Sequence, residues 1–151
     1  MIQIIVQLSA AFLGSLGYAF LFNVRGNRLL PAATGGLLVW GTYLVVGNWS
    51  HSDPFRFFIA SIVLTFYAEL FARIRKTPAT IFLVTGAIPL IPGGILYQTM
   101  NHAVHGEWAS FLISGKDTLV LALAIALGML VAISVLQSIT KVRGYQKQLI
   151  G

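Results

Sequence analysis

The chain has 151 residues, of which 57% are hydrophobic and only 9% charged, and its mean hydropathy is +0.84. A soluble domain averages roughly 25% charged residues, so this composition excludes a water-soluble globule and indicates an all-α polytopic membrane protein. The net charge of +6 does not indicate a nucleic-acid partner, because the basic residues lie in short clusters between apolar runs. The absence of cysteine excludes disulfides, thiolate metal sites and cysteine nucleophiles.

Five apolar segments approach the ~20 residues that cross the hydrocarbon core of a bilayer. They cover residues 2–22, 30–46, 55–72, 78–100 and 118–136, and we expect residues 1–151 to form a single transmembrane helical domain. The first segment has no basic region before it and no convincing cleavage pattern, so we interpret it as a span and not as a signal peptide. Within it, Ala10, Gly14 and Gly17 form a stripe of small residues that would let another helix approach closely.

The loops between the segments predict the orientation of the chain. Basic residues follow the first, third and fifth segments, whereas the other two loops contain almost none. The clustered basic residues are Arg25, Arg28, Arg73, Arg75, Lys76, Lys141, Arg143 and Lys147. Because such loops remain in the cytoplasm, we expect an outside N-terminus and a cytoplasmic C-terminus in a multi-pass protein of the cell (inner, cytoplasmic) membrane. Trp40, Trp49 and Trp108 lie near segment ends, where interfacial tryptophan is common.

The fourth segment is as apolar as a membrane span, yet prolines and glycines interrupt its centre. These residues are Gly86, Pro89, Pro92, Gly93 and Gly94. Proline removes a backbone donor and clashes with the preceding turn, so a continuous helix should break here. In hydrocarbon a broken helix is tolerated only where protein or a water-filled cavity covers the freed backbone groups, and secondary transporters use such breaks to bind substrates. The alternative is a proline kink that neighbouring helices bury without a ligand.

The break also predicts a polarity for its ligand. Pro92 suits the first position of a new half-helix, after which Gly93 and Gly94 would present free N–H donors to an anion. Thr85 and Gly86 end the preceding half-helix, where free carbonyls would accept from an ammonium or another cation. This arrangement suits an amino acid.

Glu69 is a second candidate functional residue, because a carboxylate at the edge of the hydrocarbon usually faces a cavity or a partner. Arg73 lies one helical turn further on and can pair with it on the same face. Burial favours the protonated carboxyl and Arg73 favours the charged form. Glu69 is therefore either a proton-linked residue or one half of an ion pair at the membrane boundary.

Residues 101–116 are predicted to form the longest loop, with a short interfacial helix or a re-entrant lid from Trp108 to Ile113. His102, His105 and Glu107 in this loop are residue types that bind metals, but Gly106 interrupts their helical spacing. We favour a solvated external loop over a metal hydrolase. Nothing resembles a phosphate-binding loop, a serine triad or a nucleotide fingerprint, so we expect no catalytic residues, no resident metal, no cofactor and no enzyme activity.

The stretch from Glu69 to Tyr97 resembles the threonine/serine exporter family, and most closely its small-subunit type. The residues that carry the resemblance are Glu69, Ala72, Arg73, Lys76, Pro78, Gly86, Pro89, Pro92, Gly93 and Tyr97. The family usually has a proline where this chain has Thr85, so the first part of the break should be milder here.

The resemblance implies an exporter subunit that works with a larger membrane subunit of the same family. In the fused form the family exports threonine and serine, whereas one split pair is associated with succinate. A small carboxylate is thus the expected cargo, with Gly86, Pro89, Pro92, Gly93 and Gly94 as the substrate site. Tyr97, Glu69 and Arg73 would support that site. The alternatives are a dicarboxylate exporter subunit or a structural subunit that stabilises the larger partner. Membrane lipid and further copies of this chain are other expected partners.

Overall fold

The regular structure of the described residues is helical. The structure is a computed structural model and describes residues 2–149, with side chains for residues 2–139. The helices are α1 (Ile2–Leu21), α2 (Leu29–Gly47), α3 (Asp53–Arg75), α4 (Ala79–Ala87), α5 (Gly93–Val104) and α6 (Trp108–Leu149), with the short 3-10 helices η1 (Gly26–Arg28) and η2 (Ile88–Leu90). The prediction of an all-α fold is confirmed for these residues.

Four helical stretches of the described chain are long and apolar enough to cross a membrane. They are Ile2–Leu21, Gly26–Gly47, Asp53–Arg75 and Trp108–Ile139. The pair Ala79–Leu90 and Gly93–Val104 counts as a fifth span only if both parts, bent by 62°, belong to one crossing. The bounds of the first three of these helices agree with the predicted segments to within a few residues.

The expectation of a long loop over residues 101–116 was wrong. Helix α5 continues to Val104 and α6 begins at Trp108, so the connection is the turn from His105 to Glu107. Gly106 makes this turn possible, because its φ of +73° is a conformation that other residues rarely adopt. The segment from Trp108 to Ile113 is therefore the first part of α6 and not a separate interfacial helix or lid.

The core of the bundle lies between α2, α3 and α4 and reaches α1 on one side and α6 on the other. One cluster joins Ala19 of α1 to Phe82 of α4 through alanines of α2 and α3. A second joins Val39, Leu64 and Leu90 to Leu121 of α6. The many alanines and glycines at these contacts fit membrane helices, whose association depends on close packing more than on the hydrophobic effect.

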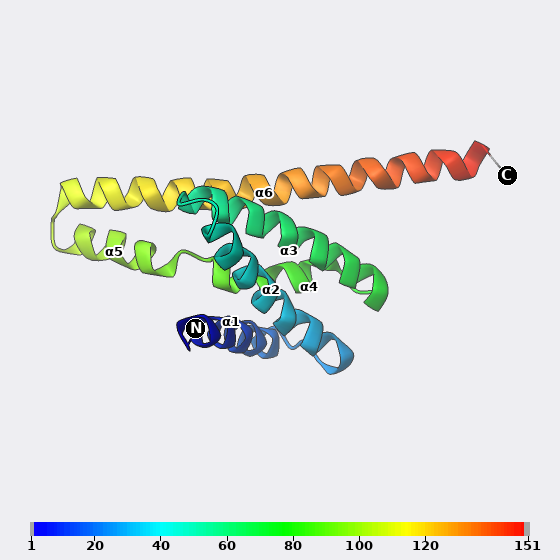
Figure 1. Cartoon of the computed structure of the whole chain (residues 1–151), viewed down its shortest axis with the longest axis horizontal. Helices are drawn as coiled ribbons and strands as arrows, with labels where there is room; N and C mark the ends of the chain where they lie inside the picture. The colour runs from blue at the N-terminus through cyan, green and yellow to red at the C-terminus, as the bar shows by residue number, and fades with distance from the viewer. Residues whose placement is uncertain (1, 150–151) are drawn as a thin grey trace.

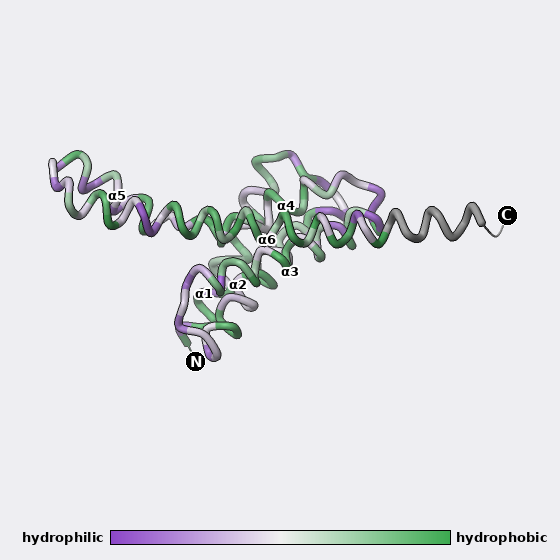
Figure 2. The backbone as a smooth tube through the Cα atoms, turned by 90° about the horizontal axis from the view of Figure 1, so that it is seen from above, coloured by the Kyte–Doolittle hydropathy of each residue, from purple (hydrophilic) through white to green (hydrophobic). Residues whose placement is uncertain are grey.

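Helix α5 and the beginning of α6 form a hairpin that extends beyond the other helices (Figure 2). Figure 1 shows α5 beside the N-terminal part of α6 and α3 beside its middle. Within the hairpin the hydroxyl oxygens of Thr99 and Thr118 lie 3.2 Å apart, and each hydroxyl also donates to a carbonyl of its own helix. The N-terminal part of α6 therefore packs against α5.

The basic connections after α1 and α3 lie at one end of the bundle. Arg25 and Arg28 from the first connection and Arg75 and Lys76 from the second line the same hollow. This agrees with the expected alternation of the first three spans. The third basic cluster, Lys141, Arg143 and Lys147, lies outside the residues whose side chains are described.

Candidate functional site: the broken segment and its cavity

The fourth segment breaks where the prolines predict. Helix α4 ends at Ala87, because Pro89 has no N–H to donate to the carbonyl four residues back, and η2 follows as a tighter turn. Ile91 is extended, and α5 then begins at Gly93. The prediction that Pro92 opens the second half-helix was wrong by one position, since Pro92 lies outside the helix as its N-cap with a ψ of 59°.

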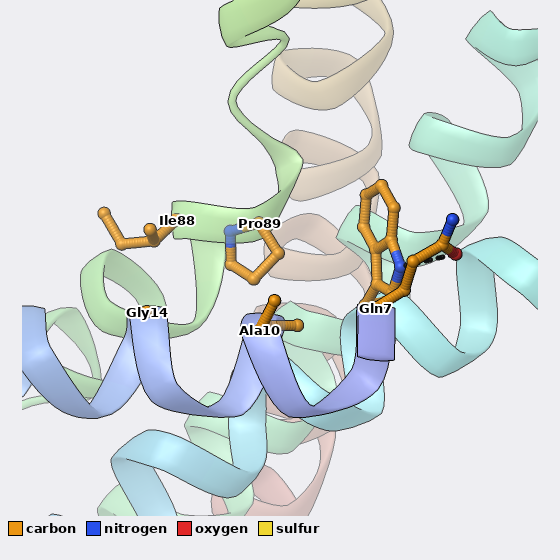
Figure 3. Close-up of a pocket in the computed structure, with 7 residues that line it drawn as sticks. Gln7, Ala10, Gly14, Ile88 and Pro89 are labelled. Carbon is orange, nitrogen blue, oxygen red and sulfur yellow. Dashed lines mark hydrogen bonds between the residues drawn. The ribbon is translucent and has the colours of Figure 1, made fainter. Parts of the chain in front are cut away.

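A cavity of about 260 Å³ lies beside the break, between α1, α2 and η2 (Figure 3). The residues that line it are Gln7, Ala10, Ala11, Gly14, Trp40, Ile88 and Pro89. Pro89 and Ile88 form one wall, and α1 forms the facing wall. The indole N–H of Trp40 donates to the amide oxygen of Gln7 over 3.4 Å, a long hydrogen bond that joins α2 to α1 at the edge of the cavity.

Small residues on α1 leave the space for this cavity. A Cβ added at Gly14 would meet no atom within 4 Å. In the predicted stripe of Ala10, Gly14 and Gly17, the two glycines have open space beside them in the described chain, so the close approach of another helix to this stripe stays a prediction. The close approach to α2 instead uses Ser15, whose side chain fits directly against Gly36.

Of the six predicted substrate residues, only Pro89 lines the cavity. Gly86 is buried, and a Cβ there would meet Leu64 and the backbone of Gly35, so this glycine lets α4 pack closely against α2 and α3. The other four, Pro92, Gly93, Gly94 and Tyr97, lie at the break and on the first turns of α5. Gly93 and Gly94 are exposed with open space around them, and Tyr97 is 72% exposed. The structure therefore does not gather the six residues into one site.

The predicted donors and acceptors of the break differ in their access. The Gly93 N–H donates to the Ile91 carbonyl over 2.7 Å, which leaves the N–H groups of Gly94 and Ile95 without an intrahelical acceptor. On the acceptor side, Thr85 is completely buried and its hydroxyl donates to the Ile81 carbonyl over 2.8 Å. Since Gly86 is buried too, the expectation that these two residues present open acceptors was wrong.

Glu69 and Arg73 pair as their spacing predicts. The carboxylate and guanidinium lie 3.8 Å apart in the last turns of α3, and their side chains are 33% and 52% exposed. Neither residue lines the cavity at the break. The geometry thus establishes the ion pair, whereas a link between Glu69 and proton transfer stays a prediction.

The polar residues at the opposite end of the bundle form local contacts. His102 Nδ1 lies 2.6 Å from Glu107 across the turn between α5 and α6, and His105 bonds to the carbonyl of Asn101. Asp53 pairs with Arg56 at 3.3 Å and also accepts from the Tyr43 hydroxyl. Among the described side chains, no three of the metal-binding acids, histidines and cysteines form a group that fits a metal ion.

The sequence analysis missed two residues of the cavity. Gln7 is a polar amide within an apolar span, and a polar side chain at such a position is a signal of a functional site that could have been used. Trp40 was interpreted only as an interfacial anchor. Its place in the lining of the cavity, together with Pro89, depends on the packing of α1 against α2, which no local pattern reveals.

Comparisons with known proteins identify the family. Neither a curated protein nor a solved structure matches this chain. The family model described as threonine/serine exporter, ThrE, matches residues 7–135, a region that includes α2 to α5 entirely, most of α1 and the first part of α6. The resemblance carried by Glu69 to Tyr97 is therefore confirmed, and the chain belongs to the threonine/serine exporter family.

Proposed function

We propose that this chain is a membrane subunit of a secondary exporter, and that its cargo contacts the cavity between α1, α2 and the break. The observation that carries the proposal is that Pro89, in the segment that carries the family resemblance, lines this cavity. A helix break is costly in hydrocarbon unless neighbouring protein or a water-filled cavity satisfies the freed backbone N–H and C=O groups. A volume of about 260 Å³ suits a small metabolite such as threonine or serine.

The chemistry of the cavity supports the need for a second subunit. Its lining contains the amide of Gln7 and the indole of Trp40 but no charged side chain. The ammonium and carboxylate of an amino acid need charged or strongly polar partners when water is removed. We infer that this chain supplies an apolar wall and the Gln7 amide, and that a larger membrane subunit supplies the charged groups.

The exporter is proposed to lie in the cell membrane and to take its cargo from the cytoplasm. The end with Arg25, Arg28, Arg75 and Lys76 would face the cytoplasm, since basic loops are retained there. Glu69, near the same end, is the proposed proton-linked residue, and Arg73 its partner. No catalytic step is part of this proposal.

Filling the cavity tests the proposal. Gly14→Leu places a side chain into the cavity from a position where a Cβ meets nothing, whereas Gly17→Leu is the matched control on the same helix, also open but outside the cavity. With the larger subunit co-expressed, Gly14→Leu should abolish efflux of threonine or serine without reducing assembly of the complex. Gly17→Leu should export normally. Normal efflux by Gly14→Leu would overturn the role of the cavity.

The structural-subunit alternative is favoured by the lack of charge in the cavity. In that case Gly14→Leu exports normally, and only loss of the whole chain, or of its assembly with the partner, stops efflux. A dicarboxylate cargo is the other alternative. Comparing exported metabolites between cells with and without this chain, with the partner present, separates succinate from threonine and serine.

A further inference from the structure

The connections α1–α2 and α3–α4 enclose a basic hollow of about 600 Å³. Its lining residues are Arg25, Gly26, Asn27, Arg28, Ile74, Arg75 and Lys76. Four of these carry a positive charge and none a negative charge. The hollow thus concentrates charge from two loops that are about fifty residues apart in the sequence.

The acidic side chains of this chain all lie elsewhere. The sequence has only four Asp and Glu residues. Three of them form ion pairs, Asp53 with Arg56, Glu69 with Arg73 and Glu107 with His102. The fourth, Asp117, lines a separate hollow together with Asp53 at the start of α3, the opposite end of that helix from Arg75. A side-chain counter-charge for the basic hollow must therefore come from another molecule.

The two turns that carry the basic side chains are held by hydrogen bonds. The Thr77 N–H donates to the Ala72 carbonyl at 3.0 Å, while Lys76 adopts a left-handed φ of 49° as the C-cap of α3. Gly26, with a φ of +65°, opens the other turn. The negative end of the α3 dipole favours Arg75 and Lys76, but it does not account for Arg25 and Arg28 on the facing loop.

We propose that the basic hollow binds the phosphate group of an anionic phospholipid at the membrane surface. Arginine and lysine recognise phosphate oxygens by charge and hydrogen bonds, and basic pockets between membrane helices bind such headgroups. The apolar surface beside the charges favours a lipid over free phosphate. Ile74, which lines the hollow, is 59% exposed, and Leu21 and Leu30, which flank the first loop, are 79% and 67% exposed.

The bound headgroup joins two connections that are about fifty residues apart in the sequence. It bridges Arg25 and Arg28 to Arg75 and Lys76, at the end of the bundle where α4 begins. Anionic lipid therefore stabilises the entry to the broken segment, whatever cargo the exporter carries.

The test uses the purified full chain in nanodiscs, and compares phosphatidylcholine alone with phosphatidylcholine plus phosphatidylglycerol. The melting temperature of the wild type should rise with phosphatidylglycerol, and the rise should shrink at high salt. Native mass spectrometry should show phosphatidylglycerol retained by the wild type. The variant Arg28→Gln/Arg75→Gln should bind it about 30-fold more weakly, from the typical contribution of each basic residue. The single variant Arg75→Gln should also bind phosphatidylglycerol more weakly than the wild type. Its control is Lys116→Gln, which removes an exposed cation of the hairpin and should bind as the wild type does.

Two outcomes with the wild-type chain overturn the proposal, and a third comes from the variants. One is a wild-type chain with no preference for phosphatidylglycerol over phosphatidylcholine, a measurement that needs no variant and so holds even if the double variant fails to fold. The other is inorganic phosphate in detergent stabilising the wild type as much as the lipid does, which would assign the hollow to free anions. Equal lipid retention by Arg75→Gln and Lys116→Gln would place the lipid elsewhere and contradict the assignment as well.

Discussion

Gly128 and Ser61 lie at a close approach between α6 and α3. The Ser61 hydroxyl donates to the Phe58 carbonyl over 2.8 Å, so it is already satisfied within its own helix and lies directly beneath Gly128. A Cβ at position 128 would contact this hydroxyl and lie 2.5 Å from the Phe58 carbonyl oxygen. Since a backbone carbonyl cannot move aside as the end of a side chain can, the helices themselves would have to separate.

We therefore expect Gly128→Ala to destabilise the chain by ~1–3 kcal/mol, the typical cost of overpacking a filled site. The matched control is Gly17→Ala on α1, where a Cβ meets no atom within 4 Å. Alanine favours helix over glycine, so the control should leave stability unchanged or raise it slightly. Thermal unfolding of both variants in the same detergent makes the measurement. Equal melting temperatures would mean that α3 and α6 are further apart than the structure places them.

The ion pair of Glu69 and Arg73 separates a structural role from a functional one. Both side chains are partly exposed, and exposed pairs contribute about 0–1 kcal/mol to stability. Glu69→Gln should consequently leave the melting temperature nearly unchanged while it removes most of the proton-driven efflux. Glu107→Gln, which breaks the pair with His102, is the control and should retain efflux. Unchanged efflux by Glu69→Gln would make the pair a boundary contact only.

At the scale of the element, the break shows what sequence predicts well and what it does not. Pro89 and Pro92 act through covalent chemistry, a missing N–H and a fixed φ, and such effects need no knowledge of neighbours. The partners of the break depend on packing. Gly86 was predicted to bind substrate but instead lets α4 pack closely against α2 and α3, and Gln7, about eighty residues from Ile88 in the sequence, lines the cavity. Local pattern cannot carry that information.

The misplaced loop has a similar explanation. Polar residues from Asn101 to Glu107, followed by Lys116 and Asp117, are typical of a loop. Residues 101–104 and Lys116 and Asp117 are helical here because α5 and α6 pack against each other as a hairpin. Only the turn from His105 to Glu107 is left of the predicted loop, and Gly106 in it has the left-handed conformation that reverses the chain. Tertiary contact overrides the composition of the segment.

The hairpin itself predicts a crosslink. The chain contains no cysteine, so a double variant Thr99→Cys/Thr118→Cys has just the two introduced thiols. Because the two hydroxyl oxygens are 3.2 Å apart, the thiols should form an intrachain disulfide on mild oxidation. Protection from thiol alkylation measures this. In Gln98→Cys/Thr118→Cys the first thiol lies on an exposed position of α5 and should stay free. Free thiols in both variants would contradict the packing of α5 on α6.

At the scale of the whole molecule, α6 is too long for a single perpendicular crossing. Its apolar part covers 32 residues. At 1.5 Å per residue this is about 48 Å, against a hydrocarbon core of about 30 Å. Lys116 and Asp117 are the charged residues of this part, so we expect the helix to leave the apolar layer near them, and α5 lies beside the N-terminal part of α6. We therefore expect the hairpin to extend beyond the bilayer core on the side opposite to the basic hollow.

The surface of the hairpin is apolar, although we expect this part to lie outside the membrane core. Val104, Trp108 and Leu112 are exposed by 83%, 66% and 67%. Trp108 suits the headgroup region of a bilayer, where one part of the indole ring contacts water and the rest contacts apolar groups. The large apolar area around it is of the kind that a partner subunit covers, which agrees with the proposed assembly with a larger membrane protein.

Opposite locations of the hairpin and the basic hollow give a test of the proposed orientation. Single cysteines can be placed at His105, the exposed tip of the hairpin, and at Asn27, which lines the hollow. If the basic end faces the cytoplasm, a membrane-impermeant maleimide labels His105→Cys in intact cells and labels Asn27→Cys only after the membrane is opened. The reverse pattern would invert the orientation and place the intake side of the cavity outside the cell. In that case, an exporter that takes its cargo from the cytoplasm could not use the end of the bundle with Glu69 and the basic hollow as its entry. The labelling result therefore tests the transport proposal as directly as an efflux assay does.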